Sequence, residues 1–425
     1  MVRPKRVLRR ALLVLLAAAA VAMGVVAWRA HTGGLRRRLL AETRERVDAR
    51  YPRPVQLGAA VPGRFGDRAA AAWDALGLQQ AHSTDVEFCR GVRDGEAPFS
   101  LAPASCLHEL EEGRAALEGL LAATHAAEGG PPAGLGSLDL PAPESHPRTW
   151  VTAAYAAKMG ALRLRGELAR GEVEAALATC ADLLALARDA SLGTALEGRL
   201  AALTVSEVAF RPCAAALDAA PAASKRRGEE VLGRVAAGAP PFAATLADWS
   251  VVVRLRAFAR YLGDALRGLP PVVQGWAAEG PRQAPLDLVD AIAVGDAWHR
   301  LQTHLDRIVA AARLPLAEAV EELTQLSGVK GGWPNPRDRV VFPELGRVAM
   351  SDARVRAQLL LLRRAAVVDA LRAETGRWPS AEELPLELRS TPGHPLRIEA
   401  SGWEAVLSDP SVPRGGLEVT VHADR

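Results

Sequence analysis

The residues with the clearest potential for catalysis are a serine and a lysine in the second half of the chain. Ser327 and Lys330 have the SxxK spacing, in which a lysine one helical turn away can activate a serine for acyl transfer. No KTG sequence follows, and the glycines on both sides of Lys330 indicate a loop rather than the start of a helix. We therefore assign no catalytic residue. An envelope serine hydrolase or acyltransferase using Ser327 and Lys330 remains the alternative hypothesis.

Histidines and carboxylates gather in one predicted helix near residue 300. Asp296 and His299 are three residues apart and could share a metal ion. His304 is turned away from His299 by about 140°, because each residue advances a helix by about 100°. The favoured interpretation is a solvated polar face that also carries Asp306. We predict no metal site and no bound cofactor.

Other motifs of known chemistry are incomplete or missing. The segment from His108 to Glu112 begins like the zinc motif HExxH, but Glu112 stands where the second histidine is required. The phosphate-binding pattern GxxxxGK[ST], the dinucleotide pattern GxGxxG and the hydrolase pattern GxSxG do not occur. Scattered Asp, Glu and His residues could still form an unfamiliar active site. Whether the protein is an enzyme stays open, with a non-enzymatic role favoured.

Composition indicates a folded, mostly helical protein. Of 425 residues, 49% are hydrophobic and 24% charged, which is a globular balance. Only 4% are aromatic, while alanine, leucine and arginine, all good helix formers, abound. The net charge is +3, and much of the excess lies in the first fifty residues. The body is therefore nearly neutral, and we predict no nucleic-acid partner.

The cysteines leave two interpretations open. No CxxC pair occurs, and histidines with zinc-ligand spacing are missing around the cysteines. In an oxidising compartment, Cys89 could pair with Cys106, and Cys180 with Cys213. Alternatively, all of them are small buried apolar side chains.

An uncharged apolar run near the N-terminus predicts a membrane anchor. Residues 11–28 number 18 and would extend about 27 Å as a helix, near the thickness of a hydrocarbon core. A basic stretch within residues 1–10 precedes this run, as in an export signal. We expect an uncleaved transmembrane helix. The competing interpretation is a signal peptide cleaved near Ala20–Ala22.

The orientation of this anchor follows from its shorter flank. Arginines lie on both sides of the run, so the charge asymmetry is small. A short basic tail is hard to translocate, whereas a long C-terminal part is not. We therefore expect a cytoplasmic tail at 1–10, a single span through the inner membrane, a juxtamembrane helix within 29–55 and a periplasmic body.

The body divides at loop signals into helical segments. Residues 150–190 predict two amphipathic helices broken near Arg170–Gly171. Further helices are expected at the following ranges: 195–235, 243–267 and 285–326, the last interrupted near Leu314–Pro315. We expect a helical domain over 56–335, built as a bundle or an irregular αα-solenoid.

A long helix and a small sheet are predicted for the final part, 340–425. The helix runs from Leu345 to Glu374, and Gly376 is positioned to end it. Its expected buried stripe consists of Val348, Val355, Leu359, Leu362 and Ala366. After residue 395 the apolar period changes to two, which predicts a small antiparallel β-meander with a turn at Ser401–Gly402.

Two stretches resemble known families. The run from Ala169 to Leu184, with its GEVEAALA core at 171–178, resembles a tetratricopeptide repeat, although no second copy appears at a 34-residue period. An ordinary αα-hairpin is the simpler interpretation. Residues 370–384, with Gly376, Trp378 and Pro379, resemble the helix-to-sheet junction of bacterial pseudopilins. The long separation from the N-terminal anchor means that fibre assembly is not implied.

The whole arrangement resembles a family of membrane-anchored proteins from myxobacteria and planctomycetes. This resemblance supplies an architecture but no activity. We therefore expect a non-enzymatic scaffold or interaction protein of the cell envelope, held in the membrane by residues 11–28 and binding another envelope protein. Trp333, in a loop between turn formers, is either a partner contact or a side chain buried against the bundle.

Overall fold

The computed structural model describes the following residues: 53–83, 89–132, 151–193, 195–267, 288–329, 341–391, 393–410 and 417–422, with residues 23, 38, 41, 42 and 45. These residues are mostly helical, as predicted. The predicted span 11–28 lies outside them except for Met23, and Lys330 and Trp333 also lie outside.

The chain divides into two compact units, which we treat separately. One comprises Met1–Glu45, Ser250–Arg307 and Val329–Val341, and the other Arg46–Trp249, Ile308–Gly328 and Phe342–Arg425. The domain boundaries expected from the sequence stay a prediction. Everything described below about the site belongs to the second, larger unit.

The larger unit begins with a small layer of short elements around a two-stranded parallel sheet. Phe65, Trp73 and Leu117 are buried in its core. Cys89 and Cys106 form a disulfide here, with their Cα atoms 6.3 Å apart. The elements are β1 (Val61–Arg64), α2 (Phe65–His82), α3 (Arg90–Arg93), α4 (Ala104–Glu112), α5 (Arg114–Ala123) and β2 (Ala126–Glu128).

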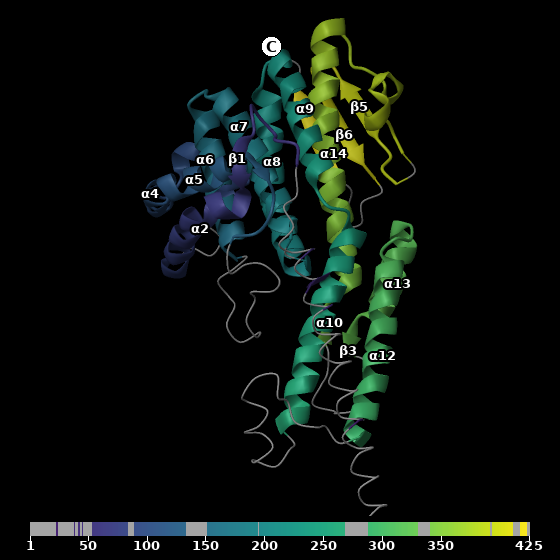
Figure 1. The fold of residues 1–425 in the computed structure, drawn as a ribbon. Coiled ribbons are helices and arrows are strands. Elements are labelled where there is room, and N and C mark those ends of the chain that lie inside the picture. The colour runs from purple at the N-terminus through teal and green to yellow at the C-terminus, as the bar shows by residue number, and fades with distance from the viewer. Residues whose placement is uncertain are drawn as a thin grey trace, which may run out of the picture. The chain divides into compact units, whose positions relative to one another are not determined.

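Four long helices follow and form the centre of the core (Figure 1). The hairpin breaks at Gly171, whose φ of 76° is the left-handed conformation that glycine adopts at no steric cost. The predicted helix 195–235 is two helices, because the chain leaves the helical conformation at Pro221, whose ψ of 154° is extended. The helices are α6 (Val151–Ala169), α7 (Val173–Ser191), α8 (Ala195–Ala219) and α9 (Ala222–Gly238).

A second disulfide ties two of these helices together. Cys180 on α7 pairs with Cys213 on α8, with their Cα atoms 5.2 Å apart. Both cysteine pairs are those predicted for an oxidising compartment.

Among the described residues, one helix is long and apolar enough to span a membrane. This helix is α8, and 61% of its most apolar window is buried inside the protein. Burial of this kind fits a core helix, so α8 and the predicted anchor at 11–28 are separate features.

Further helices and two short strands follow along the chain. They are α10 (Phe242–Arg267), α12 (Leu288–Ala311), α13 (Leu316–Leu326) and α14 (Leu345–Thr375), with short strands β3 (Gly328–Val329) and β4 (Val341–Phe342). The interruption near Leu314–Pro315 is confirmed. Helix α14 packs on α8, α9 and α13 and ends at Gly376, whose φ is 74°, as predicted. A buried ion pair between Lys225 on α9 and Asp369 fastens α14 in place.

The predicted meander is a three-stranded antiparallel sheet in the order β5–β6–β7 (Figure 1). Its strands are β5 (Arg397–Ser401), β6 (Glu404–Asp409) and β7 (Leu417–His422). Ala405 pairs with Val421 and Leu407 with Val419, and these side chains are buried toward α14. Buried Arg364 of α14 donates to the carbonyl oxygens of Leu388, Arg389 and His394, which holds the preceding loop.

Candidate functional site

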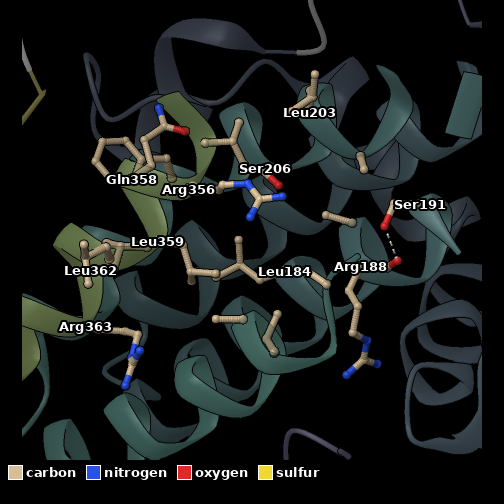
Figure 2. Close-up of a pocket in the computed structure, with 18 of the residues that line it drawn as sticks. Leu184, Arg188, Ser191, Leu203, Ser206, Arg356, Gln358, Leu359, Leu362 and Arg363 are labelled. Carbon is tan, nitrogen blue, oxygen red and sulfur yellow. Dashed lines mark hydrogen bonds between the residues drawn. The ribbon is translucent and has the colours of Figure 1, made fainter. Parts of the chain in front are cut away.

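A cavity of about 260 Å³ lies between α7, α8, α9 and α14 of the larger unit (Figure 2). Each helix faces it with apolar side chains, including Leu184, Leu203, Phe210, Val235 and Leu362. Small residues leave the space open, because Ala187, Ala202 and Ala236 also line it. An apolar cavity with a few polar groups at its edge is the usual form of a ligand site.

The buried stripe predicted for α14 is partly this cavity wall. Val348, Leu362 and Ala366 are buried as expected. Val355 and Leu359 are only half-buried and line the cavity. The helical period therefore identified the correct face of α14. Two residues on that face, Val355 and Leu359, border the cavity instead of being fully covered by side chains.

Three charged residues meet at one end of the cavity. Nε of Arg199 on α8 donates to Oδ1 of Asp352 on α14 over 2.6 Å, and Nη2 donates to the same oxygen. Nε of Arg356, one turn further along α14, donates to Oδ2 of Asp352 over 2.7 Å. Burial lowers the pKa of Arg199, and Asp352 opposes that effect. We call these residues the Asp352 triad.

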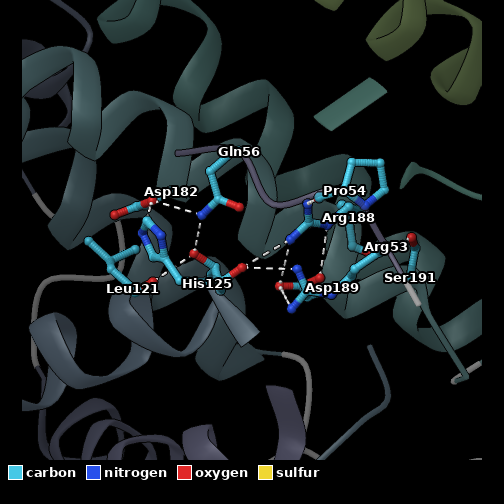
Figure 3. A network of polar contacts seen from close by, with 10 residues as sticks. Arg53, Pro54, Gln56, Leu121, His125, Asp182, Arg188, Asp189 and Ser191 are labelled. Carbon is cyan, nitrogen blue, oxygen red and sulfur yellow. Dashed lines mark hydrogen bonds and ion pairs between the residues drawn. The ribbon is translucent and has the colours of Figure 1, made fainter. Parts of the chain in front are cut away.

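A second cluster of the same composition lies beside the α7 end of the cavity (Figure 3). Arg188 donates from Nε to Oδ1 of Asp189 over 2.9 Å, and Nη2 of Arg53 lies 3.2 Å from Oδ2 of the same carboxylate. Asp189 is completely buried, and this burial raises its pKa despite both arginines. Burial also lowers the pKa of Arg53 to about 10. We call these residues the Asp189 triad.

The arginines of the Asp189 triad also donate hydrogen bonds to backbone carbonyl groups. Arg188 donates to the carbonyl oxygens of Pro54 and Thr124, at 2.9 and 3.2 Å. Arg53 donates to the Thr124 oxygen over 2.9 Å. The cluster thus joins the segment at 53–57, the end of α5 and the end of α7 (Figure 3).

A histidine extends this polar network. Nε2 of His125 lies 2.9 Å from Oδ1 of Asp182, which also accepts a hydrogen bond from Gln56 over 2.9 Å. The hydrogen bond with Asp182 is the largest effect that raises the pKa of His125, ahead of the opposing effect of burial. None of these three residues lines the cavity, so their role here is positional.

The sequence-derived catalytic candidate has a structural role. Ser327 follows α13, where its hydroxyl donates to the carbonyl oxygen of Leu323 and accepts the Leu345 N–H over 2.9 Å. The hydroxyl therefore links the end of α13 to the start of α14. The position of Lys330 is outside the described residues.

None of the polar candidates for metal binding is among the residues that line the cavity. Asp306 forms an ion pair with Arg254, and His299 is exposed, while the side chain of Asp296 is outside the described part of the chain. His108 lies 3.2 Å from Glu112 in an exposed pair on α4. No group of three or more metal-binding side chains occurs among the described residues.

Sequence reasoning missed both triads. Arg199 lies among apolar residues of α8, and Asp352 follows buried Val348 by one turn of α14, so a charged residue on an otherwise apolar helix face was the available signal. The partners could not be read from that signal, because they come from distant parts of the chain.

Fold and cavity together define a disulfide-linked helical protein with an apolar cavity bordered by arginine and aspartate clusters. Comparisons of the chain with protein-family models, with curated proteins and with solved structures give no match.

Proposed function

We propose that this protein is a membrane-tethered component of the bacterial cell envelope that works by binding rather than by catalysis. The cavity between α7, α8, α9 and α14 is its binding site. The observation that carries the proposal is the lining of the cavity, where apolar side chains predominate and the polar groups are arranged for contact.

The polar groups in that lining do not form a nucleophile and base. Ser191 donates its hydroxyl hydrogen to the Arg188 carbonyl oxygen over 2.7 Å. His394 contacts Asp409 at 3.4 Å, and neither Ser191 nor Ser206 is hydrogen-bonded to it. A serine needs a hydrogen-bonded base to act as a nucleophile near neutral pH. Binding is therefore the better account of these groups.

Two features support the location in the envelope. Residues 11–28 form an uncharged apolar run preceded by basic residues, as in a signal anchor. The described cysteines are all in disulfides, which persist in the periplasm and are rare in the cytosol. The proposal therefore has one span with a cytoplasmic tail and a periplasmic body. The proposal includes both a cavity ligand and a second envelope protein as partner.

Photo-crosslinking in cells tests the proposal directly. Leu359 of the full-length chain is replaced by a photo-crosslinking amino acid, which places the reactive group in the cavity. The matched control has the same amino acid at Leu386, which is 77% exposed. After illumination, mass spectrometry should find one reproducible adduct at 359 that is missing at 386. Identical adducts at both positions, or none at 359, would contradict a binding role for the cavity.

A further inference from the structure

The charge around the cavity is unbalanced. The Asp352 triad has two arginines and one carboxylate, and the Asp189 triad has the same composition. With all groups ionised, each triad therefore has one positive charge that no carboxylate within it compensates.

Three of the four arginines in these triads, Arg188, Arg199 and Arg356, line the cavity. The guanidinium of Arg188 is fully engaged with Asp189 and with backbone oxygens. The other titratable groups in the lining are Arg363, which Glu229 holds at 2.6 Å, and His394, which faces Asp409. No Asp or Glu is among the described residues that line the cavity. The wall thus presents cations, while their carboxylate partners lie behind it.

Arg199 and Arg356 lie together at the cavity, because both donate to Asp352. Nη2 of Arg356 also donates to the carbonyl oxygen of Pro240, just beyond the end of α9. The rest of the lining is mainly apolar and includes Leu184, Leu203 and Phe210.

An unpartnered amide adds a second observation. Gln358 is 6% exposed and lines the cavity, and its Oε1 is buried without a hydrogen-bond partner. A buried polar atom without a partner costs about 1–3 kcal/mol, so such atoms in a cavity point to a ligand or a water. Rotation of the amide by 180° exchanges its oxygen and nitrogen, so Gln358 can accept from a hydroxyl or donate to an anion.

The dimensions suit a short chain with a polar end. At about 260 Å³ the cavity is slightly below the roughly 300–1,000 Å³ of sites for drug-sized ligands, so it suits a slender ligand. A second hollow of about 330 Å³, lined by both Arg53 and Asp248, shares Ser191 and Ala239 with the cavity and extends the space beside Ser191.

We infer that the cavity binds an amphiphile with a single alkyl or acyl tail and an anionic carboxylate or phosphate head. The tail lies among Leu184, Leu203 and Leu359, and the head lies at Arg199 and Arg356. Guanidinium groups suit this head because their N–H groups form charge-assisted hydrogen bonds with carboxylate and phosphate oxygens. The inference rests on the proposed binding function and adds the chemistry of the ligand.

The test uses the full chain in nanodiscs of zwitterionic lipid, with empty nanodiscs to subtract partition into lipid. Decanoate, decyl phosphate and decanol are titrated as probes of equal tail length, and binding is measured by calorimetry. We expect saturable 1:1 binding of at least one anionic probe, about tenfold or more tighter than decanol, a ratio equivalent to 1.4 kcal/mol. The tighter anion distinguishes a fatty-acid ligand from a phosphate-bearing one.

Arg356→Gln isolates the contribution of the charge. It removes one cation while the buried Arg199–Asp352 pair remains, and the Arg356 side chain is 44% exposed, so the fold should persist. The matched control, Arg227→Gln, removes an exposed arginine that does not line the cavity. We expect Arg356→Gln to weaken binding of the anionic probe about tenfold and to leave binding of decanol unchanged. Arg227→Gln should change the affinity for neither probe.

Leu359→Trp tests the position of the tail by filling the cavity from α14. All probes should then lose saturable binding, while circular dichroism shows the same helical content. Equal affinity for decanol and the anions, no saturable binding of any probe, or no effect of Arg356→Gln would overturn the inference. The crosslink at position 359 reads out occupancy by any ligand, so the proposed function can stand when the anionic amphiphile fails.

Discussion

Arg199 on α8 and Asp352 on α14 are 153 residues apart in the chain and form a buried ion pair, with a 2.6 Å hydrogen bond from Nε to Oδ1. Each side chain is at most 6% exposed. Asp352 also accepts from Arg356, so one carboxylate orients two arginines at the edge of the cavity. The pair therefore holds α8 against α14, and it also positions two of the positive charges that line the cavity.

Removing this carboxylate should be strongly destabilising. In Asp352→Asn, Arg199 stays buried without its counterion, and breaking a buried pair in this way costs about 3–5 kcal/mol. Chemical denaturation of the full chain measures the loss in free energy of unfolding. The control is Glu96→Gln, which breaks an exposed pair with Arg211 and should cost about 1 kcal/mol or less. Equal losses in the two variants would show that Asp352 is not a packing determinant.

The disulfide between α7 and α8 should contribute measurably to stability. Cys180 and Cys213 are 33 residues apart, and cross-linking a loop of that size stabilises by about 3.7 kcal/mol through the reduced entropy of the unfolded chain. We expect the double variant Cys180→Ser and Cys213→Ser to unfold at correspondingly lower denaturant. A reductant should lower the stability of the wild type more than that of the variant, because the variant has only the Cys89–Cys106 disulfide left to lose.

The same cysteines test the compartment. In intact cells, trapping of free thiols with a maleimide before lysis should modify none of the cysteines unless a reductant is added first, because all of them are paired. Modification of the wild-type chain without reductant would argue for a cytosolic body. An alkaline phosphatase fusion at the C-terminus gives an independent measurement, with activity expected for a periplasmic body.

The pair of His125 and Asp182 should make stability depend on pH. The pKa of His125 is raised above 6.5 mainly by its hydrogen bond to Asp182, so its stabilising contribution is complete below pH 6.5. The contribution is lost as the pH rises through the higher pKa of the folded state. The free energy of unfolding should therefore fall more between pH 6 and pH 9 in the wild type than in His125→Gln. A steeper fall in the variant would contradict this assignment.

A close approach between α13 and α14 predicts a sensitive glycine. A Cβ at Gly346 would lie 2.9 Å from the Val320 carbonyl oxygen and even closer to Oγ1 of Thr324. We expect Gly346→Ala to destabilise the protein by about 1–3 kcal/mol, the usual cost of overpacking. Gly91→Ala is the control, because a Cβ there has no atom within 4 Å. Its effect should be small and should favour the helix, since alanine has the higher helix propensity.

Ser327→Ala separates the structural role of this serine from the alternative catalytic one. Loss of the hydroxyl removes the acceptor of the Leu345 N–H, which should cost about 1 kcal/mol or more in free energy of unfolding. A serine-reactive probe should label neither the wild type nor the variant at this position. Labelling of the wild type that disappears in Ser327→Ala would favour the hydrolase hypothesis over the binding function.

Local patterns in the sequence determined the secondary structure well. The helical period located α6, α7 and α14, and Gly376 marked the end of α14 because only a residue tolerant of positive φ suits that cap. The change to period two located the strands of the meander. The one clear error, a single helix over 195–235, came from giving Pro221 too little weight as a breaker.

Tertiary structure alone decided which of these elements meet. Read along the chain, Arg199 and Asp352 are two of several charged residues in their helices, and only the packing of α8 on α14 makes them a pair. The cavity is likewise invisible in sequence, because it is the space that side chains from four helices leave unfilled. Sequence periodicity shows which face of a helix is apolar, but long-range packing decides which other element that face contacts. In this protein, long-range packing therefore decides both the Arg199–Asp352 pair and the cavity.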